Sequence, residues 1–313
     1  MTPESAIDEV LIEFAAEVGS EGPVSVRGGG TRWHAGGDLA PGTREVWAPA
    51  GIVALEPAEM TVRVRAGTTV AELHEALAEA GQRTALPERP ASTVGGALTV
   101  GESAITRLGL GPVRDALLQA RYVCADGRVA TGGAATVKNV SGFDLCRLLV
   151  GSLGEALLRT LPVPESENWC RLESPDPREV WRRCRTATSI LWDGAVTWVL
   201  LSGYAADTAA DRVTLGELGE VSDAAGPPPL PPHRWSCTPA EAAAFDRDNG
   251  TAPAGATGDI DFVAEIGVGV VHASVPRPSR PTEPGLAGLN RRMKECFDPT
   301  GRLNPGRDPL RRN

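Results

Sequence analysis

A glycine-rich stretch at residues 24–37, "VSVRGGGTRWHAGG", offers the clearest chemistry in the sequence. Glycine weakens strands and helices, so three in a row indicate positive φ angles or close approach of a ligand to the main chain. Consecutive N–H groups without side chains between them form an anion-binding nest, which suits a pyrophosphate. Arg27 and Thr31 flank the glycines and add further donors. The alternative is a tight loop without a ligand.

Two common phosphate-binding patterns do not fit this stretch. The P-loop pattern GxxxxGK[ST] needs a lysine that the stretch lacks. The Rossmann pattern GxGxxG needs a third glycine where the sequence has Trp33. A nicotinamide enzyme of Rossmann type is therefore disfavoured.

Three further glycine-rich segments follow: "STVGGALTVG" at 92–101, "KNVSGFDL" at 138–145 and "GSLGEALL" at 151–158. Several such turns favour a long cofactor held by main chain from several loops. A flat ring system in particular needs close backbone approach and few bulky side chains.

Composition excludes several classes of function. The 313 residues carry a net charge of −9 without a basic block, which disfavours nucleic acid as a partner. No run approaches 18 apolar residues and the N-terminus lacks signal-peptide features, so we expect no membrane span and a cytoplasmic location. The six cysteines form no CxxC pair, which predicts buried reduced thiols and no metal site in the chain.

Hydrophobic periodicity predicts the elements that carry these loops. We expect a helix over 7–18, strands at 24–28, 45–49 and 60–67, and a helix that starts at a Thr69–Glu72 capping box and ends near Gly81. Residues 86–103 are expected to be a loop. A hairpin over 117–124 and 128–131 turns at Asp126–Gly127.

The composition changes near residue 165. Beyond it we expect helices at 178–188, 207–219 and 239–247, strands at 196–202 and 260–274, and a proline-rich loop at 226–232. This order suits a small α+β domain with an antiparallel sheet. A last helix stops at Asp298–Pro299.

The motifs resemble, in order, those of the FAD-binding PCMH-type (vanillyl-alcohol oxidase / p-cresol methylhydroxylase) family, with the nearest likeness to the smaller FAD-binding subunit of bacterial glycolate oxidase. They are "VRGGGT", "VRVRAGTTVAELHEAL", "STVGGAL", "GPVRDALL", "ADGRV", "VKNVSGFDL", "GSLG" and "FDPTGRLNPGR". The likeness covers about residues 1–165 and 285–307. It implies an α+β protein: a PCMH-type FAD domain of two α/β subdomains at 1–165, a smaller antiparallel-sheet α+β substrate or cap domain at 166–284, and a tail at 285–313 that returns to the FAD domain.

The resemblance also implies the residues that hold FAD. "RGGGT" would lie over the pyrophosphate, "STVGG" would pass the pyrophosphate and flavin, "KNVSGFDL" would shape the next turn, and the strand after "GSLG" would meet the adenine through main chain. Thr31 stands where some relatives have a histidine linked to the flavin, so the FAD is expected to be non-covalent. The expected cofactor-binding residues are Arg27, Gly28, Gly29, Gly30, Thr31, Ser92, Thr93, Gly95, Gly96, Asn139, Gly142, Asp144, Leu157 and Leu158.

The sequence departs from the family at two expected FAD contacts. After "STVGGAL" the family usually continues "ATGASGP", whereas this chain has "TVGESAI", which brings Glu102 towards the pyrophosphate. The family's "GSLGTLGVIT" is "GSLGEALLRT" here.

The resemblance implies an oxidoreductase subunit that oxidises a 2-hydroxy acid by hydride transfer to flavin N5, or relays electrons among flavoprotein and iron–sulfur partner subunits. Such an oxidation needs a base for the hydroxyl proton. His272, at the end of a predicted strand, is the candidate base, and the alternative is a packed structural histidine. The second domain lacks a cluster of His, Arg and Tyr residues, so a non-catalytic FAD-fold subunit that assembles with a catalytic partner stays open.

Overall fold

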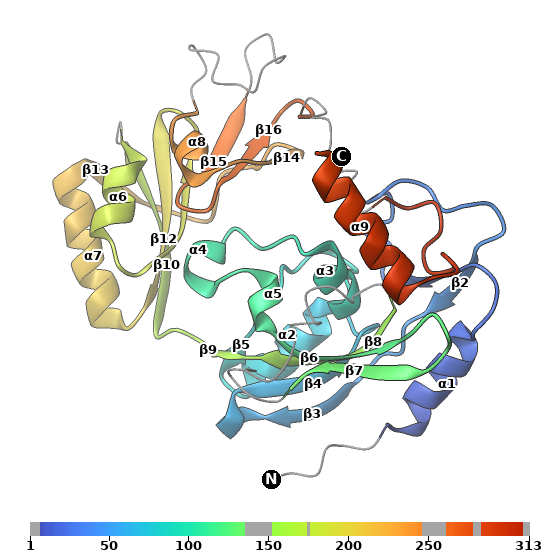
Figure 1. The fold of residues 1–313 in the computed structure, drawn as a ribbon. Helices are drawn as coiled ribbons and strands as arrows, with labels where there is room; N and C mark the ends of the chain where they lie inside the picture. The colour runs from blue at the N-terminus through green and yellow to red at the C-terminus, as the bar shows by residue number, and fades with distance from the viewer. Residues whose placement is uncertain (1–6, 135–151, 174–175, 246–260, 278–282, 309–313) are drawn as a thin grey trace. The chain divides into compact units, whose positions relative to one another are not determined.

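The computed structural model describes residues 7–134, 152–173, 176–245, 261–277 and 283–308 (Figure 1). The chain forms two compact units. The first comprises residues 1–104, 112–163 and 281–313, and the second comprises residues 105–111 and 164–280. Residues 105–111 thus cluster with the second unit, although the predicted bounds put them inside residues 1–165.

The first unit begins with a small parallel sheet. Helix α1 (Glu9–Val18) is capped by the carboxylate of Asp8, and strands β1 (Val24–Arg27) and β2 (Arg44–Trp47) pair in parallel behind it. The chain returns to this sheet near its C-terminus, where Leu303 bridges to Val24. The predicted helix and both strands are confirmed.

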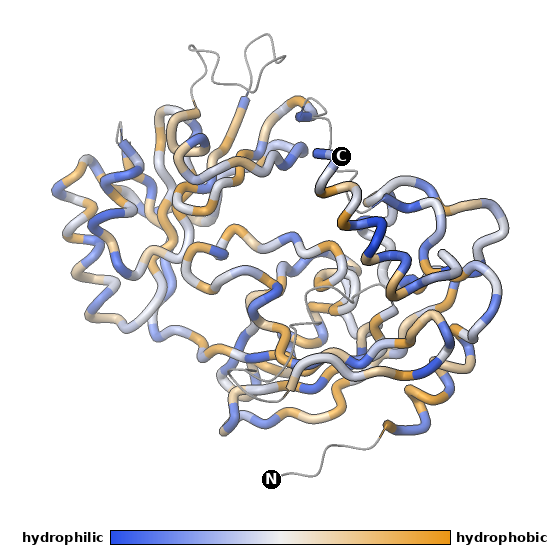
Figure 2. The backbone as a smooth tube through the Cα atoms, viewed as in Figure 1, coloured by the Kyte–Doolittle hydropathy of each residue, from blue (hydrophilic) through white to orange (hydrophobic). Residues whose placement is uncertain are grey.

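A five-stranded antiparallel sheet forms the larger part of this unit. Its order is β3 (Ile52–Glu56), β4 (Thr61–Arg65), β8 (Leu153–Arg159), β6 (Leu117–Val123) and β7 (Val129–Gly133). Along β4, polar Thr61, Arg63 and Arg65 alternate with buried Val62 and Val64, and Figure 2 shows apolar (orange) and polar (blue) positions mixed along the strands of this sheet. One face therefore packs against helices α2 (Val70–Glu79), α3 (Val94–Val100) and α5 (Val113–Ala116).

A buried ionic cluster occupies other positions of the same sheet. Glu155 on β8 is 1% exposed, and its carboxylate lies 2.8 Å from Arg65, 3.0 Å from Arg63 and 3.2 Å from Arg121. Arg65 also pairs with Asp8 at the start of α1. The cluster thus joins three strands and one helix, and the sequence departure at "GSLGEALL" is accommodated by three arginines.

Several local predictions are confirmed, and two are wrong. The capping box at Thr69 forms, and the hairpin turns at Gly127 with a φ of 84°. The expected loop at 86–103 instead contains α3, because Thr93 caps a helix that opens with glycines. The expected helix at 178–188 ends early: α6 (Pro177–Arg183) stops and strand β11 (Ala187–Trp192) follows.

The second unit is a seven-stranded antiparallel sheet with helices, as the α+β prediction requires. Helices α4 (Arg107–Leu110), α6, α7 (Ala205–Leu218) and α8 (Pro239–Ala243) accompany it, and an aromatic cluster that includes Phe262 fills its core. Its strands, in sheet order, are β13 (Glu220–Ala224), β10 (Ser166–Glu173), β12 (Val196–Gly203), β11, β15 (Phe262–Glu265), β16 (Val270–Ala273) and β14 (His233–Ser236).

The thiols are only partly as expected. Cys170 and Cys184 are buried, and desolvation raises the pKa of Cys184 to about 12, so that thiol is unreactive at neutral pH. Cys296 on α9 (Pro284–Phe297), in contrast, is exposed. Within the described ranges, every helix is too short or too polar to cross a bilayer.

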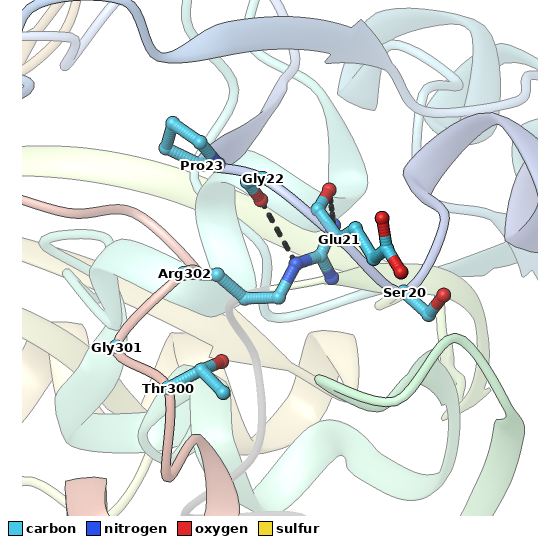
Figure 3. Close-up of a pocket in the computed structure, with 7 residues that line it drawn as sticks. All are labelled: Ser20, Glu21, Gly22, Pro23, Thr300, Gly301 and Arg302. Atoms are coloured by element: carbon cyan, nitrogen blue, oxygen red, sulfur yellow. Dashed lines mark hydrogen bonds between the residues drawn. The ribbon is translucent and has the colours of Figure 1, made fainter.

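One arginine of the C-terminal segment after α9 makes many contacts with the rest of the first unit. Arg302 is 5% exposed, and desolvation lowers the pKa of its guanidinium group. Figure 3 shows it beside a shallow pocket of about 390 Å³, which is lined by residues 20–23 and 300–302. The guanidinium donates to five main-chain carbonyls, those of Val18, Gly19, Glu21, Gly22 and Ala125.

We expect Arg302→Ala to lower the free energy of unfolding by about 2–4 kcal/mol, because it strands several buried carbonyls. Arg128→Ala is the control, since the Arg128 side chain makes an exposed ion pair with Asp126 and its loss is expected to leave the free energy of unfolding nearly unchanged. Urea unfolding measures both, and equal losses would contradict the anchoring role of Arg302.

Candidate cofactor-binding site

The loop after β1 presents main-chain donors. Gly30 adopts a φ of 71°, a conformation that favours glycine. Among the residues that the structure describes, none accepts a hydrogen bond from the N–H groups of Gly29, Gly30 or Thr31. These three consecutive donors are the geometry that an anion-binding nest requires.

Two glycine-rich segments that are distant in sequence lie against each other. A Cβ atom on Gly28 would lie 2.2 Å from Thr93 Oγ1, and one on Gly29 would lie 1.6 Å from the carbonyl oxygen of Ala91. Both distances are far below contact. Gly28 and Gly29 are therefore required by the protein's own packing, whereas the sequence suggested approach of a ligand as their reason.

The segment at 91–96 adds an unpartnered hydroxyl group. Ser92 is 6% exposed, and its Oγ has no hydrogen-bond partner among the described residues. Thr93, in contrast, uses its Oγ1 to accept from the N–H of Gly96 at 3.2 Å. Gly95 is fixed by its N–H bond to the Ala66 carbonyl at 2.8 Å. A buried hydroxyl without a partner is costly, so Ser92 is suited to bind a ligand.

Arg27, which was predicted to donate to the pyrophosphate, contacts a carboxylate and two tryptophan rings of the protein. Its guanidinium group pairs with Glu45 and lies 4.8 Å from the ring centre of Trp33 and 5.3 Å from that of Trp47. Arg307 covers Trp33 as well, at 4.3 Å, so the C-terminal segment helps to shape the glycine loop. The predicted role of Arg27 as a pyrophosphate donor stays a prediction.

The sequence analysis missed two arginines, of which Arg32 directly follows the glycine loop and Arg89 lies just before the segment at 91–96. The guanidinium groups of Arg32 and Arg89 each lie 2.5 Å from a different oxygen of the Glu102 carboxylate. Glu102, whose charge seemed unfavourable for a pyrophosphate, thus belongs to a cluster with a net positive charge. An acidic residue beside an expected anion site is the signal that could have prompted a search for such arginines.

The remaining expected cofactor contacts are on β8 or outside the described residues. Leu157 and Leu158 lie on β8, which pairs on both sides with β4 and β6. Their predicted main-chain contact with adenine stays a prediction. Asn139, Gly142 and Asp144 lie outside the described residues.

His272 lies on β16 of the second unit. Its Nε2 atom is 2.8 Å from Oε1 of Glu265, a carboxylate that is almost fully buried. A carboxylate at this distance fixes the orientation of the imidazole ring. A catalytic role for His272 stays a prediction.

Known proteins are similar to the part of the chain that carries these residues. Residues 8–133 match the family described as FAD binding domain. Glycolate oxidase subunit GlcE of Escherichia coli (strain K12) is 30% identical over 185 residues, which are 55% of this chain and 52% of that protein. D-lactate dehydrogenase of Archaeoglobus fulgidus is 34% identical over 149 residues, 46% of this chain and 32% of that one. The matches span about half of the first relative's length and a third of the second's.

The fold is also found in a solved structure. Alkyldihydroxyacetonephosphate synthase superposes with a TM-score of 0.66 over 95% of this chain and 73% of that chain, at 14% identity. The likeness at this identity concerns the fold alone, and the expected PCMH-type fold is confirmed.

We expect Gly29→Ala to destabilise the first unit by more than about 2 kcal/mol, because the new methyl group collides with the Ala91 carbonyl. Gly285→Ala on α9 is the control, since a Cβ there meets nothing within 4 Å. Thermal unfolding compares the two. A Gly29→Ala protein as stable as the control would refute the close approach of these segments.

Proposed function

We propose that this chain, whose residues 8–133 match the family described as FAD binding domain, is the FAD-binding subunit of an oxidoreductase that acts on a 2-hydroxy acid. The observation that carries the proposal is that the N–H groups of Gly29, Gly30 and Thr31 and the nearby Ser92 hydroxyl group have no hydrogen-bond partner among the residues that the structure describes. These groups lie inside the matched segment, and they suit a pyrophosphate.

The residues present fit FAD. The main-chain donors at 29–31 would bind pyrophosphate oxygens, and Ser92 would donate from its hydroxyl group. Arg32 and Arg89 would add positive charge beside them. Bound flavin supplies the hydride acceptor at N5, and the chain holds and orients it non-covalently, since Thr31 cannot form the covalent link.

The substrate class is inferred from two relatives and one side-chain pair. The names of the two relatives refer to glycolate and D-lactate, both of which are 2-hydroxy acids. Oxidation of such an acid removes a hydride from C2 and a proton from the hydroxyl group, and leaves a 2-oxo acid. His272 would accept that proton, with Glu265 orienting its ring.

The chain would act with partner subunits of the flavoprotein and iron–sulfur types, in the cytoplasm. The support is that two relatives are described as subunits: GlcE, and GlcD of Bacillus subtilis, which is 29% identical over 126 residues.

A non-catalytic FAD-fold subunit is the second candidate. The observation in its favour is that Glu102 already occupies Arg32 and Arg89.

We expect purified protein incubated with FAD and desalted to show flavin absorption near about 370 and 450 nm, which glycolate or D-lactate bleaches without oxygen. Colourless protein would contradict FAD binding and favour the non-catalytic candidate. Retained flavin that neither acid bleaches would contradict the proposed substrate class.

Ser92→Ala is expected to weaken FAD binding about tenfold without loss of stability, because its hydroxyl group has no partner to lose in the described parts of the chain. Ser189→Ala is a matched control: Ser189 is also buried and its hydroxyl group also lacks a partner among the described residues, but it lies in the second unit on β11. Flavin fluorescence titration gives both dissociation constants. Equal values for the two variants would remove Ser92 from the site.

A further inference from the structure

The bridge from Arg32 through Glu102 to Arg89 has the form of an occupied anion site. Each guanidinium group binds its own oxygen of one carboxylate, at 2.5 Å in both cases. Arginine binds phosphate oxygens with the same charge-assisted geometry. A phosphate group between the two arginines could therefore replace both contacts that Glu102 makes.

The position of the bridge connects it to the nest. Arg32 directly follows Thr31, the last of the three uncommitted N–H groups, and its Nε atom is buried without a hydrogen-bond partner among the described residues. Arg89 begins the turn that carries Ser92, since its carbonyl accepts from the Ser92 N–H at 2.9 Å. Both arginines thus belong to the segments that present the unpartnered donors.

Burial decides whether such a bridge can open. The Glu102 side chain is 16% exposed, and those of Arg32 and Arg89 are 32% and 35% exposed. Ion pairs that are partly open to water are weak, because water competes for both partners. Glu155 makes the same kind of contacts with Arg65 and Arg121, but all three are at least 95% buried. Opening that cluster would leave uncompensated buried charge, which is strongly unfavourable.

We propose that Arg32 and Arg89 form a phosphate-binding site and that Glu102 is an internal carboxylate competing for it. The inference rests on the proposed function, because the phosphate it assigns to this site belongs to the pyrophosphate of FAD. Glu102 then sets the affinity of the chain for FAD. When the phosphate binds, the carboxylate leaves the arginines and turns towards water.

The first test is the dissociation constant of FAD for Glu102→Gln, measured by flavin fluorescence. Binding is expected to tighten at least about tenfold, since a neutral amide competes poorly for two guanidinium groups. Riboflavin, which lacks phosphate, should bind both proteins equally. Glu88→Gln is the matched control: it removes the same charge next to Arg89, but Glu88 is 57% exposed and pairs with His74. It should leave the FAD constant unchanged.

A double variant separates competition from a general charge effect. In an Arg89→Gln background the gain from Glu102→Gln should fall below about threefold, because half of the site is gone. A gain that persists there, an unchanged constant in the single variant, or weaker binding would overturn the proposal. Glu102→Ala provides the same comparison if the glutamine variant does not fold.

Inorganic pyrophosphate distinguishes failure of this inference from failure of the proposed function. Absence of FAD binding to every protein would refute the function. The anion site would then still predict that pyrophosphate raises the melting temperature of Glu102→Gln more than that of the unaltered protein. Equal shifts would refute the site itself.

Discussion

The close approach of residues 28–29 to residues 91–93 is the constraint on which the candidate site depends. A single Cβ atom on Gly29 would meet the Ala91 carbonyl at 1.6 Å, so no other residue type fits without moving one segment. This contact brings together the loop after β1 and the turn before α3. It therefore brings the N–H groups at 29–31 close to Ser92, and these groups and the Ser92 hydroxyl lack hydrogen-bond partners within the described ranges. The glycines thus allow the two segments to pack closely, and their N–H groups are available to bind a ligand.

The first unit contains two clusters of arginine with glutamate, one around Glu155 and one around Glu102, and they differ in how deeply they are buried. Around Glu155 the carboxylate and the guanidinium groups of Arg65 and Arg121 are buried in the sheet, where they link three strands and where separating them would leave uncompensated buried charge. Around Glu102 the same groups remain open to water, where ion pairs are weak and exchangeable. The first cluster stabilises the sheet, while the second suits exchange of a carboxylate for another anion.

Local signals in the sequence predicted local structure well. The capping box at Thr69 and the Asp126–Gly127 turn formed because the groups that satisfy each other lie within a few residues. Helix α3 was missed since its glycines oppose helix formation, and packing against α5 and the sheet outweighs them. The glycine segments were correctly singled out, but the Arg32–Glu102–Arg89 bridge spans 70 residues and depends on tertiary folding that no spacing rule contains.

The C-terminal segment completes the glycine loop from the far end of the chain. Arg302 anchors it through carbonyls at the end of α1 and beyond, and Asp298 orders the turn by accepting from the N–H groups of Arg302 and Leu303. That anchoring places Arg307 against Trp33, where its guanidinium group also donates to the carbonyls of Trp33 and Ala35. The loop at 28–35 is therefore held by residues that follow the whole second unit in sequence. Its donors can take their final arrangement only after the chain has returned, which links formation of the site to completion of the fold.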